Sequence, residues 1–132
     1  MAAPLRRHCD VQGPYAAARA RAEVHRLVRE ALLAGSLVKQ TVEDAAALVV
    51  SELVSNAVRH AGGACSLDLS LEPDGLDIDV SDPSPEPPRP RATDTTSEGG
   101  RGWAIVARLT SELTVHSDEH GKTVHAHIDQ AR

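Results

Sequence analysis

The sequence of 132 residues contains no phenylalanine and only one tryptophan and one tyrosine, so aliphatic side chains must fill its core. Apolar residues make up 41% of the chain. This length suits one domain, and we expect a single domain over residues 1–132. A domain of roughly 150 residues buries about 68–70% of its unfolded surface, so stability does not require disulfides or a structural metal.

The sequence also lacks features that mark other classes of protein. Its net charge is −5, with no basic block and few aromatic residues, which argues against direct binding to nucleic acid. No stretch approaches the roughly 20 apolar residues that span a bilayer, and the N-terminus has no apolar signal-peptide run. Only two cysteines are present, Cys9 and Cys65, which favours a reducing compartment. We therefore expect a cytoplasmic protein without membrane contact.

Hydrophobic periodicity predicts helices and hairpins. Apolar residues recur at helical spacing over 15–34 and 42–61, and glycines follow both segments. Alternating apolar and polar residues predict β-hairpins over 65–82 and 113–129, and a weaker strand over 5–9. A short helix is expected over 102–109. This order favours an α+β two-layer sandwich, an antiparallel-rich sheet with helices on one face.

The segment after the first hairpin reads as a long loop. Residues 83–90 hold five prolines, and Thr, Ser and Gly follow as far as residue 102 without apolar periodicity. Loops of this length inside a compact domain are usually functional or disordered.

One predicted helix carries a polar pair. Glu52 and Asn56 are four residues apart, so their side chains are neighbours, and Ser55 and Arg59 share their side of the helix. An amide oxygen and nearby carboxylates are suitable ligands for Mg²⁺, and a glutamate can orient or deprotonate a hydroxyl group. The same pattern also fits a solvated helix face.

Two further motifs can serve a nucleotide. Gly99, Gly100 and Gly102 lead directly into an apolar helical pattern, where backbone N–H groups can approach phosphate, and Arg101 adds a positive charge. Asp82 ends an alternating strand, where its carboxylate can accept a hydrogen bond from the exocyclic amine of adenine. Glycines also end ordinary loops, and aspartate before proline is common in turns.

In order and spacing, these motifs resemble the nucleotide-binding boxes of the GHKL ATPase superfamily, which has the fold of histidine-kinase catalytic domains. The resemblance covers about residues 16–128. The segment ELVSNAVRHA (residues 52–61) is most similar to the corresponding segment of the anti-sigma-factor serine kinases of bacteria, including short ATP-binding regulators of actinobacteria. It implies a histidine-kinase-like ATPase fold, with a mixed, mostly antiparallel sheet and helices on one face.

The resemblance also implies roles for single residues. Asn56 would coordinate the Mg²⁺ that bridges the ATP phosphates, and Glu52 would act as the general base or polarise the nucleophile. Asp82 would recognise adenine by a hydrogen bond, and the hydroxyl group of Thr123 would support the adenine end of the site.

The remaining implied residues belong to the phosphate side of the site. Gly100 and Gly102 would meet the phosphates at the start of the lid helix, with Arg101 near the terminal phosphates. Residues 83–101 would form the ATP lid.

The implied function is that of an ATP-dependent serine/threonine kinase. It would phosphorylate an anti-anti-sigma (STAS-type) partner and sequester a sigma factor, and a homodimer is an option because relatives often dimerise.

Two alternatives stay open. The family pattern Asp-x-Gly-x-Gly is replaced by Asp82-Pro83-Ser84-Pro85-Glu86, and proline removes backbone donors, which favours a partner-binding module with weak or no nucleotide turnover. The catalytic half of a histidine kinase also fits, although the sequence shows no upstream helix pair with a phospho-accepting histidine.

A zinc site is the remaining hypothesis. His116, His120, His125 and His127 lie in the last hairpin, but their spacing is irregular and no cysteine is near.

Overall fold

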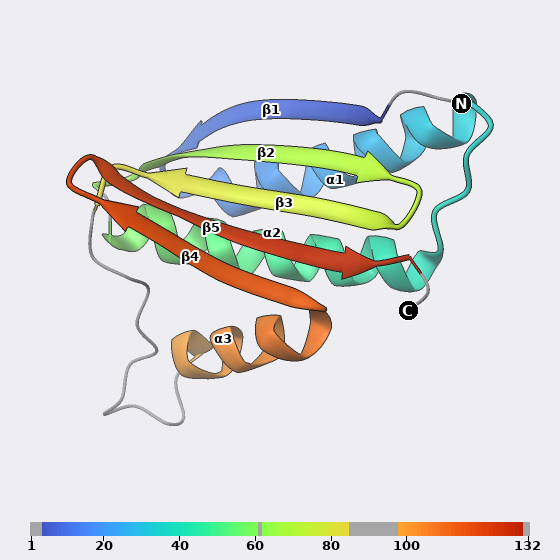
Figure 1. Cartoon of the computed structure of the whole chain (residues 1–132). Coiled ribbons are helices and arrows are strands. Elements are labelled where there is room, and N and C mark those ends of the chain that lie inside the picture. The colour runs from blue at the N-terminus through green and yellow to red at the C-terminus, as the bar shows by residue number, and fades with distance from the viewer. Residues whose placement is uncertain (1–3, 61, 85–97, 131–132) are drawn as a thin grey trace.

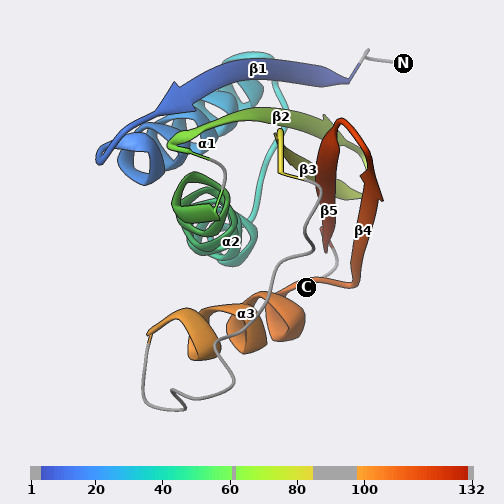
Figure 2. The same ribbon diagram turned by 90° about the vertical axis from the view of Figure 1, so that its left-hand side faces the viewer.

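The computed structural model describes residues 4–60, 62–84 and 98–130, which form a layer of strands and a layer of helices (Figure 1). The elements in chain order are β1 (Leu5–Gln12), α1 (Ala16–Leu33), α2 (Gln40–His60), β2 (Ala64–Glu72), β3 (Gly75–Asp82), α3 (Glu98–Leu109), β4 (Glu112–Asp118) and β5 (Gly121–Asp129). The strand order is β1-β2-β3-β5-β4, and the four pairings are antiparallel. The helices lie on one side of the sheet (Figure 2), which confirms the α+β prediction.

Several element boundaries in the structure differ from the predicted ones. The weak strand expected over 5–9 is β1, which continues to Gln12, and the short helix expected from Gly102 begins at Glu98 as α3. Of the predicted lid, residues 98–101 form the first turn of α3, and residues 85–97 lie outside the described residues.

Helix α1 ends where the sequence predicts. Gly35 has a φ of +87°, a conformation that suits glycine, and its amide donates to the carbonyl of Leu32. The amide of Ser36 donates to the carbonyl of Ala31 at 2.8 Å. These two bonds form a Schellman motif, which satisfies the last carbonyls of the helix and turns the chain toward α2.

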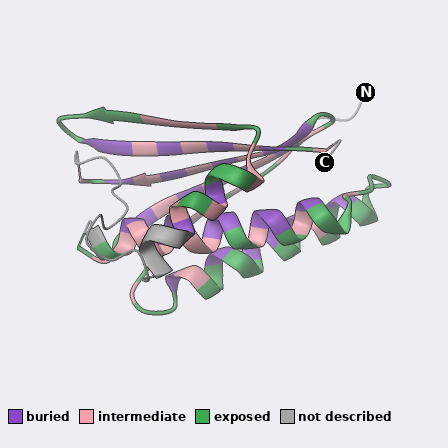
Figure 3. Cartoon of the chain, turned by 90° about the horizontal axis from the view of Figure 1, so that it is seen from below, coloured by how far each residue is buried: buried purple, intermediate pink, exposed green. Residues whose placement is uncertain are grey.

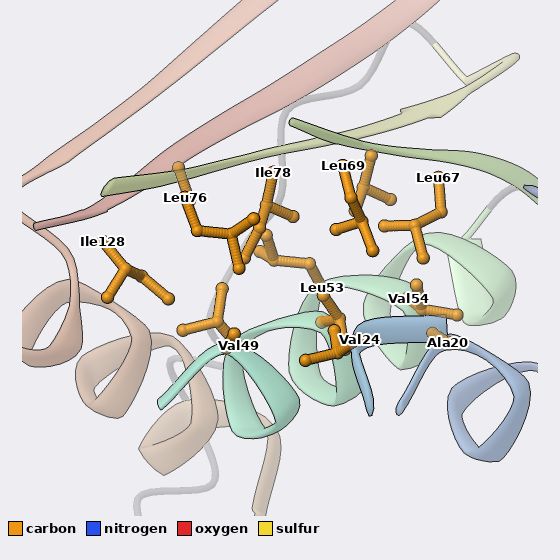
Figure 4. Close-up of a cluster of buried hydrophobic side chains, with 14 of the residues drawn as sticks. Ala20, Val24, Val49, Leu53, Val54, Leu67, Leu69, Leu76, Ile78 and Ile128 are labelled. Atoms are coloured by element: carbon orange, nitrogen blue, oxygen red, sulfur yellow. The ribbon is translucent and has the colours of Figure 1, made fainter. Parts of the chain in front are cut away.

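Strand alternation builds the core. On β2 and β3, every second side chain faces the helices, where Leu67, Leu69 and Ile78 are at most 2% exposed. They meet the buried stripes of α1 and α2, including Val24 and Val49 (Figure 4), and the burial pattern along the helices is seen in Figure 3. Among the described residues, aliphatic side chains therefore fill most of the space between the layers.

The opposite face of the sheet is polar. Its positions on β2, β3 and β5 carry Asp, Ser, Thr and His side chains that are partly exposed. Among the described residues, no helix is both long and apolar enough to cross a membrane.

Candidate functional site

Helix α2 holds the polar pair on a rigid support. The helix contacts α1, α3 and the strands β2, β3 and β5. Its apolar stripe packs inward as predicted, with Val50 and Leu53 at most 3% exposed. Glu52 and Asn56 are half-buried and one turn apart, so their side chains are neighbours at the edge of the core.

One glycine of the motif, Gly102, lies directly against Glu52. Gly102 is buried in α3, and a methyl group placed on it would lie 2.0 Å from Oε2 of Glu52. Only a residue without a side chain permits this approach. The contact joins two motifs that are 50 positions apart in the sequence.

Gly102 directly follows the first turn of α3, so its contact brings the N-terminal end of this helix close to Glu52. The first turn contains Gly99 and Gly100, and the first N–H groups of a helix have no partner within the helix. Such groups bind anions, while the neighbouring carboxylate and amide oxygens suit a hard cation. The side chain of Arg101 is outside the described part of the structure.

Asp82 is the last residue of β3, and its side chain is buried on the helix-facing side of the sheet. There it forms an ion pair that the sequence did not predict. Nζ of Lys122 on β5 lies 2.8 Å from Oδ2 and 3.0 Å from Oδ1 of Asp82. The backbone amide of Ser84 donates to Oδ1 at 2.8 Å. Sequence reasoning missed Lys122, although its position in the alternation of β5, two residues before Val124, places it on the buried face.

Two cavities lie beside Asp82. One of about 580 Å³ is at the ends of β1, β2 and β3, and its lining includes Gln12, Arg19, Cys65, Asp82 and Pro83. The other, of about 320 Å³, follows the turn between β4 and β5 and is lined by Asp82 and Lys122 among others. The lining of these two cavities does not include Glu52 or Asn56.

Cys65 is not a reactive group in the larger cavity. Burial, together with the negative charge of Asp82, raises the pKa of Cys65 to about 11. The thiol therefore stays protonated near neutral pH and acts as an apolar side chain.

The structure does not bring Thr123 next to the carboxylate of Asp82. Register pairs Thr123 with Ser81, and the two hydroxyl groups lie 2.8 Å apart. Both point to the outer face of the sheet, whereas the carboxylate of Asp82 is on the helix-facing side.

Two histidines of the outer face, His125 and His127, are paired with aspartates. Nδ1 of His125 lies 2.7 Å from Asp79, and Nδ1 of His127 lies 2.7 Å from Asp77. Burial lowers the pKa of His127, but the hydrogen bond and charge of Asp77, with further nearby carboxylates, raise it above its ordinary value.

These pairs do not support the zinc hypothesis. In the part of the chain that the structure describes, no three or more His, Cys, Asp or Glu side chains form a group able to hold a metal ion. His116 and His120 are exposed.

Comparison with known proteins agrees with this geometry. The sequence model of a family described as the histidine kinase-like ATPase domain matches residues 15–128. No curated protein shows significant similarity to the chain.

Among solved structures, the RsbU and RsbW domains of Rv1364c from Mycobacterium tuberculosis superpose with a TM-score of 0.68 at 19% identity, covering 96% of this chain and 32% of that one. The histidine kinase domain of the blue-light activated histidine kinase EL346 from Erythrobacter litoralis gives a TM-score of 0.57 at 21% identity, covering 85% and 61%. The chain therefore spans less than two thirds of either structure, and at these identities the likeness establishes the fold.

Proposed function

Since the chain belongs to the histidine kinase-like ATPase family, we propose that it binds ATP with Mg²⁺ and acts as an anti-sigma-factor-like serine/threonine kinase. The contact between Gly102 and Glu52 carries this proposal, because it puts a phosphate-binding type of helix N-terminus beside a carboxylate and an amide. Neither motif is specific alone, and their meeting in space is what favours a nucleotide site.

The residues present fit a magnesium ion. The side-chain oxygens of Asn56 and Glu52 are hard donors, and both residues are only half-buried. Gly102 leaves room for the carboxylate of Glu52, which a larger residue would displace. Asn56 would hold the ion, which supplies neutralisation of the phosphate charge when it is bound.

In the proposed reaction, the γ-phosphoryl group of ATP moves to a serine hydroxyl of the partner. The bond from the γ-phosphorus to the bridging β–γ oxygen breaks, a bond to the serine oxygen forms, and ADP leaves. Glu52 accepts or orients the serine proton. The protein contributes mainly positioning and charge stabilisation, as in other phosphoryl transfers.

The proposed partners are an anti-anti-sigma protein of the STAS type and a sigma factor, which the chain would bind in the cytoplasm. The proposed assembly is a homodimer. The likeness to a solved structure that contains an RsbW domain supports this class of regulator. Arg101, Gly100 and the lid over 83–101 would complete the phosphate side, and Asp82 and Thr123 the base side.

Isothermal titration with ATP, with and without Mg²⁺, tests the nucleotide site. We expect Mg²⁺-dependent binding that is lost in Asn56→Ala and kept in Ser55→Ala, a neighbouring half-buried position on α2. Transfer from radiolabelled ATP to a STAS-type partner then tests the kinase, and it should be lost in Glu52→Gln.

A partner-binding module with weak or no turnover is the second candidate function. Two observations favour it, the Lys122 ammonium that occupies Asp82 and the proline that follows Asp82. Partner binding without phosphoryl transfer, by protein that does not bind Mg·ATP, would select this function over the kinase.

A further inference from the structure

The most buried ion pair of the described residues lies at the proposed base-reading position. The side chain of Asp82 is 1% exposed and that of Lys122 is 3% exposed. Removing two charges from water is costly, so such pairs persist only with close hydrogen bonding, and this pair has it at 2.8 and 3.0 Å.

The carboxylate of Asp82 is nearly fully occupied. An ionised carboxylate offers about four acceptor sites. Oδ1 receives Lys122 and the Ser84 amide, and Oδ2 receives Lys122. With three of about four sites filled, an adenine amine competes with the ammonium at Oδ2.

The ammonium is the stronger competitor. Both the ammonium and the exocyclic amine of a base can donate to the carboxylate, but only the ammonium adds the Coulomb attraction of a full positive charge. The lysine stem is flexible, and Lys122 borders a cavity of about 320 Å³ into which the ammonium can move. Displacement is thus sterically feasible but unfavourable.

We propose that Lys122 is a specificity-determining residue that occupies the base-reading carboxylate of Asp82 and thereby weakens both the affinity for ATP and the selection of adenine. The inference rests on the proposed function, because it concerns the base end of the same site. In the wild-type protein, phosphate contacts supply most of the affinity, and the base supplies little.

The test compares Mg²⁺ complexes of ATP, GTP and inorganic tripolyphosphate by isothermal titration. For the wild type, we expect ATP and GTP affinities within about threefold of each other, a difference smaller than one hydrogen bond. For Lys122→Met, we expect ATP to bind about tenfold more tightly, since one charge-assisted hydrogen bond to the base becomes available. Binding of tripolyphosphate should not improve.

The chain offers a matched control. Lys39 is an exposed lysine, and Lys39→Met removes the same charge far along the chain from Asp82. It should leave the ratio of ATP to tripolyphosphate affinity unchanged. If Lys122→Met does not fold, as judged by circular dichroism, Lys122→Gln keeps a neutral donor for Asp82 and should show a smaller gain in the same direction.

The outcomes separate this inference from the proposed function. Wild-type protein that prefers ATP over tripolyphosphate by more than about 100-fold, a difference of several hydrogen bonds, would overturn the inference alone. A Lys122→Met variant that is folded and gains nothing for ATP would do the same. If neither the wild type nor the variants bind ATP or tripolyphosphate, the proposed function fails and this inference with it.

Discussion

Gly102→Ala adds one methyl group at the point where α3 contacts α2. An added Cβ would lie 2.0 Å from Oε2 and 2.8 Å from Cδ of Glu52, and Cβ contacts under 3.0 Å essentially do not occur. The carboxylate must therefore move from 2.0 Å to at least 3.0 Å, a shift of about 1 Å at the least. Because Oε2 ends a flexible side chain, the shift needs no movement of the backbone.

The expected result is a loss of function without a loss of stability. Alanine is more favourable than glycine inside a helix by about 0.5–1 kcal/mol, which offsets the displacement of Glu52. A misplacement of about 1 Å in a reacting group can lower a rate by about 100-fold. We expect phosphoryl transfer at saturating Mg·ATP to fall by about that factor, with thermal unfolding unchanged or slightly later.

Transfer to a STAS-type partner and thermal unfolding by circular dichroism measure the two effects. Ala107→Gly is the matched control, since Ala107 is exposed on the same helix and its change alters only helix propensity. This variant should unfold earlier and keep its transfer rate. Wild-type transfer by a folded Gly102→Ala variant would refute a role for the contact between Gly102 and Glu52.

Three further predictions follow from the structure. Asn56→Ala should abolish Mg·ATP binding in isothermal titration and change stability by less than about 1 kcal/mol, because Asn56 is half-buried; unchanged affinity would contradict its assignment. The raised pKa of His127 means that the folded state holds its proton more tightly, so this stabilisation is complete below about pH 6.5 and is lost as the pH rises through the folded pKa. Urea unfolding across this range should show the decline, and His127→Gln should reduce it; an equal slope in the variant would contradict the pairing with Asp77. Ile78→Ala should lower the free energy of unfolding by about 2–5 kcal/mol, since Ile78 is 0% exposed; a loss below about 1 kcal/mol would show that the strand is not packed on the helices.

The sequence predicts the layers of this fold because its patterns are local. The alternation around Leu67 and Ile78 marks one buried face on each strand, and the helical stripe through Val50 and Leu53 marks the face that covers it. The same periodicity places Glu52 and Asn56 together, because one helical turn separates them.

What the sequence could not predict depends on pairing between distant segments. The α3 helix begins at Glu98, although glycines in its first turn disfavour a helix by about 1 kcal/mol each, because packing on α2 adds contacts that local propensity does not contain. The pairs of His125 and His127 with aspartates follow from the register of β3 with β5, and that register depends on the strand order. The ion pair of Asp82 with Lys122 arises in the same way.

The most direct test of the central claim is a nuclear magnetic resonance titration of the protein with Mg·ATP. If Asn56 and Gly102 belong to one phosphate site, the side-chain amide of Asn56 and the backbone amide of Gly102 should shift together with one apparent dissociation constant. Bound ATP that leaves both amides unchanged, or shifts them with different constants, would contradict the claim.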